Sequence, residues 1–150
     1  MEIYVGSDHR GYLYKDKIIG ILAELGYEAK DCGTYEDGNS CDYPKYAYTV
    51  ASKVAKKKDS RGVLVCMSGI GQTIAANKVK GAYAALCYNA KSAELSRLHN
   101  NANVLVLSAK FVKAKDLKNI LKVWLSTSFE GGRHQRRLDM IKKIESGKKL

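Results

Sequence analysis

The sequence predicts an α/β protein, a three-layer α/β/α doubly wound sandwich with a five-stranded parallel sheet. Short apolar segments rich in β-branched residues alternate with longer segments of helical period, and this strand–helix unit returns about five times. Residues 62–66 are apolar almost without interruption, which is typical of a strand covered by helices on both faces. No repeat or change in composition marks a linker, so we expect residues 1–150 to form a single Rossmann-like domain.

Each predicted strand is a short apolar run bounded by glycine or polar residues. The first run ends at the turn Gly6-Ser7-Asp8, and the second follows Gly26, which would end the preceding helix. The third run ends at a glycine-containing turn over residues 68–71. Strands are therefore expected at residues 3–5, 27–32, 62–66, 82–87 and 103–107.

The predicted helices follow from apolar residues that recur at helical spacing. A polar loop over residues 33–42 precedes Pro44, whose fixed φ suits the first turn of a helix. The glycine turn leads directly into another helix, as expected at the carboxyl end of a parallel strand. Helices are expected over residues 12–25, from Pro44 through Val54, from the glycine turn through Asn77, and around 92–98, 115–125 and 137–144.

The composition combines 26 Lys and Arg with 15 Asp and Glu, a formal net charge of +11. Such an excess attracts an anionic partner. No recognition helix, zinc finger or RNA-binding signature accompanies it, so nucleic acid is not expected. No apolar run is long enough to span a bilayer, and residues 1–5 lack the order of a signal peptide. We therefore expect no membrane association and a cytoplasmic location.

The four cysteines show neither CxxC pairs nor zinc-finger spacing, and a cytoplasmic protein is not expected to form disulfides. Cys66 differs in its context, because it ends a strand just before a helix. The helix dipole at that position is expected to lower the pKa of the thiol toward neutrality. On its own the position is weak evidence of chemistry, because a cysteine that ends a core strand usually packs in the core.

Two loops beyond the carboxyl ends of predicted strands carry chemically active groups, where ligands of such sheets bind. The loop at residues 6–11 holds Asp8, His9 and Arg10. The loop at 66–73 holds Cys66 and two glycines, whose backbone N–H groups can face an anion. It lacks the GxGxxG and P-loop patterns, so a nucleotide cofactor is not expected.

Two further clusters lie outside these loops. One is Arg97-Leu98-His99-Asn100, where the histidine is either a site residue or a partner of a helix dipole. The other is the arginine-rich segment 131–137, where Arg133 and Arg137 are four residues apart and share a helical face. Such a pair can clamp a phosphate group, although a solvated basic face is the alternative.

Taken together, the motifs resemble the type B ribose-5-phosphate isomerases of the ribose/galactose isomerase family. The resemblance covers nearly the whole chain and rests on Gly6-Ser7-Asp8-His9, Asp42-Tyr43-Pro44, Cys66-Met67-Ser68-Gly69-Ile70-Gly71, Ala75-Ala76-Asn77-Lys78, Arg97-Leu98-His99-Asn100 and Gly131-Gly132-Arg133-His134. It implies an isomerase that interconverts ribose 5-phosphate and ribulose 5-phosphate through an enediolate, with neither metal nor cofactor. It also implies a homodimer, or a tetramer as the alternative, with active sites and the C-terminal helix at the subunit interface.

The resemblance also assigns roles to four catalytic residues. Cys66 matches the base that moves a proton between C2 and C1, and Gln72 stands where a second branch of the family has a glutamate base. His99 matches the residue that helps to open the furanose ring. Asp8 would orient the ring hydroxyls, and Ser68 would assist ring opening and proton transfer.

The remaining implied residues bind the substrate. The phosphate group would be held by basic side chains, the enediolate by backbone N–H groups of the glycine turn, and the sugar by residues that line the same cleft. The phosphate-binding residues are His9, Arg133 and Arg137, with Lys110. The N–H groups are those of Gly69, Ile70 and Gly71, together with Ser68. The residues that line the cleft are Tyr43 and Asn100.

Three departures from the family pattern bear on the substrate. Met67 stands where glycine is usual, and Tyr83 and Lys110 stand where arginines are expected. Two alternatives follow from the sequence. The first is an isomerase of a six-carbon sugar phosphate, such as allose 6-phosphate or galactose 6-phosphate. The second is a non-catalytic basic module that binds phosphosugars or nucleic acid.

Overall fold

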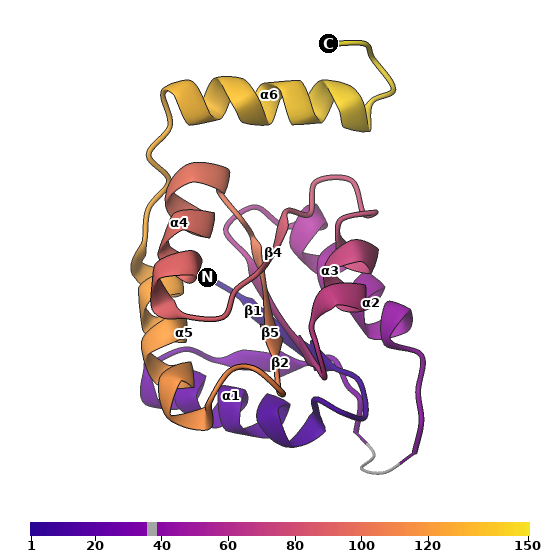
Figure 1. Ribbon diagram of the computed structural model, residues 1–150, viewed down its shortest axis with the longest axis vertical. Helices are drawn as coiled ribbons and strands as arrows, with labels where there is room; N and C mark the ends of the chain where they lie inside the picture. Colours follow the sequence, from indigo (N-terminus) through magenta and orange to yellow (C-terminus); the bar gives the residue numbers. More distant parts are fainter. Residues whose placement is uncertain (36–38) are drawn as a thin grey trace.

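The computed structural model describes residues 1–35 and 39–150 and contains a five-stranded, all-parallel sheet (Figure 1). The prediction of a doubly wound α/β/α fold is confirmed. The strands run in the order β2-β1-β3-β5-β4 across the sheet. They are β1 (Ile3–Ser7), β2 (Ala29–Asp31), β3 (Arg61–Cys66), β4 (Ala84–Leu86) and β5 (Val104–Ser108). Of the polar loop predicted at 33–42, residues 36–38 lie outside the described residues.

Helices cover both faces of this sheet. They are α1 (Tyr12–Glu24), α2 (Tyr43–Lys56), α3 (Ile70–Ala76), α4 (Ala90–Asn100), α5 (Leu117–Ser126) and α6 (Arg133–Glu145), with a 3₁₀ turn, η1 (Ala114–Asp116), before α5. One apolar layer lies between the sheet and α1, α4 and α5, and includes the fully buried Trp124. A second layer, between the sheet and α2 and α3, is built from small and β-branched side chains such as Ala47 and Val50. None of the described helices is both long and apolar enough to cross a membrane.

The two edge strands, β2 and β4, are shorter than the sequence predicts, with three residues each. An edge strand has a neighbour on one side only, so its ends lack partners that would extend the ladder. The last helix is longer than predicted, since α6 begins at Arg133 directly after two glycines of positive φ, Gly131 and Gly132. Its first turn therefore includes the arginine-rich segment.

The helix α6 lies across the end of the molecule where α4 ends, apart from the helical layers (Figure 1). Only His134 and Leu138 of this helix are buried, whereas the large apolar side chains Met140, Ile141 and Ile144 are exposed. A groove of about 440 Å³ lies between α6 and the edge of the sheet at β4. Its lining includes Tyr83, Ala84, Leu138, Ile141 and Ile144.

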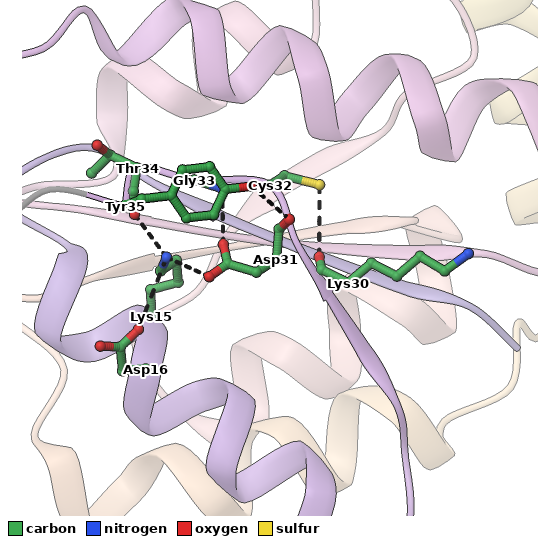
Figure 2. A network of polar contacts seen from close by, with 8 residues as sticks. All are labelled: Lys15, Asp16, Lys30, Asp31, Cys32, Gly33, Thr34 and Tyr35. Atoms are coloured by element: carbon green, nitrogen blue, oxygen red, sulfur yellow. Dashed lines mark hydrogen bonds and ion pairs between the residues drawn. The ribbon is translucent and has the colours of Figure 1, made fainter.

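A buried lysine fixes the segment that follows β2 (Figure 2). Lys15 of α1 is 1% exposed, and its Nζ donates to Asp31 Oδ2 and to the carbonyl of Thr34, each at 2.7 Å. Asp31 also accepts a bond from the backbone N–H of Gly33. Two backbone bonds then join this segment to Ser7 at the end of β1. Because a buried ammonium group needs partners, this network holds the start of the 33–42 loop against the carboxyl end of the sheet.

Candidate active site

The carboxyl ends of β1, β3 and β5 bring several predicted site residues together. Ser7 is in register with Val65, and Cys66 is in register with Ser108. Asp8 directly follows β1, and Cys66 is the last residue of the neighbouring strand β3. The loop after β1 passes close against β3, since a Cβ atom at Gly11 would collide with the carbonyl of Val65. Glycine is the residue that permits this approach.

Asp8 is a buried carboxylate at this edge, 6% exposed. Its Oδ1 accepts bonds from the backbone N–H groups of Arg10 at 3.0 Å and Gly11 at 2.9 Å. Burial raises the pKa of this carboxyl above its ordinary value, while the two N–H groups act in the opposite direction. The side chain is therefore fixed in place beside the end of β3.

Cys66 lies at the centre of the group and is 5% exposed. Its Sγ accepts a bond from the N–H of Gly69 at 3.1 Å, and Gly69 has φ +82°. Burial raises the pKa of the thiol, the Gly69 N–H lowers it, and the negative charge of Asp8 raises it again. The expectation that the helix dipole lowers this pKa is wrong, because burial outweighs the N–H groups at the start of α3, a helix of seven residues.

The glycine turn and Tyr43 meet beside the thiol. Ser68 Oγ accepts a bond from the N–H of Ile70 at 3.3 Å. A Cβ atom at Gly71 would collide with the ring of Tyr43, so that ring lies directly over the turn. The N–H of Lys110 donates to the carbonyl of Met67 at 3.1 Å and so brings the loop after β5 to the same edge.

His9 is oriented by a residue that the sequence did not single out. The backbone N–H of Cys41 donates to His9 Nδ1 at 3.2 Å, and the N–H of His9 donates to Cys41 Sγ at the same distance. A backbone N–H can only donate, so Nδ1 is the acceptor and the ring proton of neutral His9 is on Nε2. His9 can therefore donate from Nε2 to an anion. The two residues are 32 positions apart, and no local pattern points to their contact.

The other predicted site residues lie at the opposite end of the strands, on the side where the amino ends of the strands meet. His99 and Asn100 end α4, and Arg133 and Arg137 are exposed on the first turns of α6. Because α4 returns the chain to the amino end of β5, its last residues lie far from the carboxyl ends of the strands. Arg97, from the same motif as His99, is buried and donates to the carbonyl of Ala102 at 2.6 Å. The structure therefore separates the predicted site into two groups.

Within this second group, His99 stacks on His134 with ring centroids 4.3 Å apart and an interplanar angle of 7°. Glu130 places its Oε2 3.7 Å from the Nε2 atom of each ring. Burial and the neighbouring His99 lower the pKa of His134. Neither a role for His134 nor the contribution of Glu130 was predicted from the sequence, because Glu130 meets His99 only through the packing of α4 against the segment before α6.

The neighbouring carboxylate makes the titration of Cys66 testable. Replacement of Asp8 by asparagine is expected to lower the pKa of the Cys66 thiol, because the charge that disfavours the thiolate is removed. The pH dependence of thiolate absorbance, taken as the difference between Asp8→Asn and the same variant carrying Cys66→Ser, measures this pKa. Asp59→Asn is the control, because it removes an equal charge at the far end of β3. Asparagine tolerates the φ of +65° at this position. The pKa of Cys66 should not change in this variant. An unchanged or higher pKa in Asp8→Asn would contradict the proximity of the two groups.

The chain as a whole is similar to known proteins. The model of the family "Ribose/Galactose Isomerase" matches residues 3–141. Ribose-5-phosphate isomerase B of Escherichia coli is 42% identical over 96% of both chains. A crystal structure of ribose-5-phosphate isomerase B from Mycoplasma genitalium with bound ribulose-5-phosphate superposes with a TM-score of 0.93, at 43% identity over 97% of this chain and 96% of that one. The enzyme of the same name from Clostridium thermocellum gives 0.93 at 42% identity, over 98% and 99%. The chain belongs to the ribose/galactose isomerase family.

Proposed function

We propose that this protein is an isomerase that interconverts ribose 5-phosphate and ribulose 5-phosphate. The family and the relatives that carry this activity in their names support the reaction. The observation that carries it is the Cys66 thiol, held between a buried carboxylate and a turn of backbone N–H groups. The reaction is an internal proton transfer, so its chemistry requires no redox cofactor.

At the carboxyl edge, Cys66 is the base. As the thiolate it takes the proton from C2 of the open-chain aldose and returns a proton to C1, which converts the aldehyde into the ketose through an enediolate. At the start of α3, the N–H of Gly71 donates to the developing oxyanion, and the N–H of Ile70 donates there in place of its 3.3 Å bond to Ser68 Oγ. Asp8 accepts a hydrogen bond from a sugar hydroxyl. Ser68, in the glycine turn, assists ring opening and proton transfer. Tyr43, over Gly71, covers this side of the sugar.

The phosphate group and the ring-opening step need residues from both edges of the sheet. His9 Nε2 donates to phosphate from the carboxyl edge, with Lys110 on the neighbouring loop. Arg133 and Arg137 supply a bidentate clamp, and His99 opens the furanose ring beside Asn100. These four residues lie at the opposite edge in the same chain, so a second copy of the chain must supply them.

We therefore infer a homodimer in which each site takes Cys66 from one subunit and His99 from the other. The exposed apolar side chains of α6, with the groove beneath that helix, support this helix as part of the interface. Tyr83, one of the departures from the family pattern, lines this groove. A tetramer made of two such dimers remains the alternative, and a cytoplasmic location remains a prediction.

The preferred substrate is expected to be the five-carbon sugar phosphate. Met67 is 41% exposed at the glycine turn and occupies space that the family leaves open with glycine. A pocket that lacks room for one more carbon discriminates by roughly tenfold or more. We expect kcat/KM for ribose 5-phosphate to exceed that for allose 6-phosphate and galactose 6-phosphate by at least about that factor.

The experiment measures kcat/KM of the purified protein for the three sugar phosphates. In the variant Met67→Gly, the difference in kcat/KM between the five-carbon and six-carbon substrates should be smaller. Absence of any ribulose 5-phosphate product would reject the proposed reaction. A higher kcat/KM with either six-carbon sugar would assign the protein to that substrate instead. DNA binding with a steep salt dependence, in a protein without isomerase activity, would favour the basic binding module.

A further inference from the structure

Three side chains, two imidazoles and one carboxylate, meet where the end of α4 packs against the start of α6. His99 ends α4, Glu130 precedes α6, and His134 belongs to the first turn of α6. One ligand atom from each lies within 4.8 Å of the other two, and Glu130 Oε2 is 3.7 Å from both Nε2 atoms. The backbone already holds these groups together, because Glu130 N–H donates to the carbonyl of Leu98 at 3.0 Å.

The two Nε2–Oε2 distances are close to the distances between ligand atoms that share one metal ion. Bonds of about 2.0–2.1 Å to nitrogen and oxygen place two ligand atoms of a tetrahedral zinc site about 3.3 Å apart. The Nε2–Oε2 separations exceed this by a few tenths of an ångström. His99 and Glu130 are partly exposed, so both can turn toward an ion that enters from solvent. The two rings are stacked with an interplanar angle of 7°, so His99 has to rotate out of this stack before both lone pairs point to one ion.

The second observation concerns His134, whose side chain is 5% exposed. Its Nε2 has no hydrogen-bond partner among the described residues. A buried polar atom without a partner carries a free-energy cost, which a ligand at this position would remove. Glu130 Oε2 is 3.7 Å from this atom, and the ring of His99 is stacked on the same imidazole.

We propose that His99, Glu130 and His134 form a binding site for a divalent transition-metal ion of the zinc class. Two imidazoles and one carboxylate, with water in the fourth position, suit Zn²⁺ and its neighbours. Mg²⁺ and Ca²⁺ prefer oxygen ligands throughout and are not expected to bind. The ion is an inhibitor rather than a cofactor, because it occupies the nitrogen that His99 needs for ring opening. This inhibitory role rests on the proposed function, whereas the binding site does not.

Nearby cations limit the strength of the site. Arg133 and Arg137 lie on the same turns of α6 and reduce the local affinity for a positive ion. The same arginines attract the substrate phosphate, so substrate and metal ion compete for one corner of the protein. Zinc inhibition is therefore expected to weaken as the concentration of ribose 5-phosphate increases.

The test begins with binding of Zn²⁺ to the full-length protein after chelator treatment, measured by calorimetry. We expect one Zn²⁺ per chain, with affinity lowered about tenfold or more in Glu130→Gln and in His134→Gln. Glu130 is half-exposed, so its variant should fold even if the buried His134 does not tolerate replacement. Glu94→Gln removes an equal charge from α4, outside both groups of site residues, and should bind Zn²⁺ like the unmodified chain. Mg²⁺ should give no heat of binding.

Co²⁺ distinguishes this site from the cysteines. A sulfur-to-cobalt charge-transfer band would place the ion on a thiolate such as Cys41 or Cys66, and would overturn the proposal. Unchanged Zn²⁺ affinity in Glu130→Gln would overturn it as well. Isomerase assays form a separate arm: Zn²⁺ should inhibit, a chelator should restore the activity, and Glu130→Gln should need about tenfold more Zn²⁺. Bound Zn²⁺ without inhibition would reject the inhibitory role and leave the binding site in place.

Discussion

Cys66→Ser is expected to lower turnover of ribose 5-phosphate by about 10³-fold, within the range that a positioned general base contributes. A serine hydroxyl is a far weaker acid than a thiol, so the alkoxide needed to take the C2 proton is almost absent at neutral pH. The substitution changes one atom. Serine Oγ can still accept the bond that Sγ receives from the Gly69 N–H, so the fold should persist.

Turnover is measured as formation of ribulose 5-phosphate, with thermal unfolding of the variant as the check on its fold. Cys32→Ser is the matched control, because Cys32 is half-buried just after β2, where its Sγ donates to the carbonyl of Lys30 at 3.6 Å and its side chain packs against the core. The control should keep its activity. Near-normal turnover in Cys66→Ser, with unfolding unchanged, would remove this residue from the role of base.

Mixing two inactive variants is expected to restore activity if each site takes residues from two chains. Cys66→Ser and His99→Asn should each be inactive as homodimers. In a mixed dimer, one site carries both substitutions and the other carries neither. Random pairing places half of the chains in mixed dimers, so about one quarter of the unmodified activity should return.

Co-expression of the two variants, with separate affinity tags to isolate the mixed dimer, removes the inactive homodimers, so in this sample about half of the unmodified activity should return. The matched control pairs Cys66→Ser with Asp8→Asn. Asp8 and Cys66 lie at the same edge of one chain, so in that mixed dimer every site has one defect and activity should not return. Equal recovery in both pairs, or recovery in neither, would contradict a site shared between subunits.

The sequence was a good guide to the elements and a poor guide to long-range contacts. All five strands follow from apolar runs, because a strand buried on both faces leaves a strong pattern. Their order does not follow, since β5 lies between β3 and β4 although it comes last in the chain. The pairing of Cys41 with His9, and of Glu130 with His99, depends on packing between segments about 30 residues apart, where periodicity carries no information.

The chemistry of Cys66 shows a related limit. The position of this residue at the end of a strand was predicted, and the structure places it beside Asp8 and the glycine turn. The direction of the pKa shift of Cys66 was not predicted, because the burial of the thiol depends on how loops from two other strands pack over it. A helix N-terminus can be read from a motif, whereas the polarity of the space in front of it depends on the assembled fold.

The late insertion of β5 has a consequence for the growing chain on the ribosome. Once residues 1–100 have been synthesised, β2, β1 and β3 can pair, but one edge of β3 has no strand beside it, and β4 pairs only with β5. This edge belongs to one of the most apolar segments of the protein and carries unpaired backbone groups. Until residues 104–108 emerge and fill the gap, the nascent chain is open to strand addition by a neighbouring polypeptide. Conditions that stall translation between β4 and β5 should therefore promote aggregation more than stalling after β5.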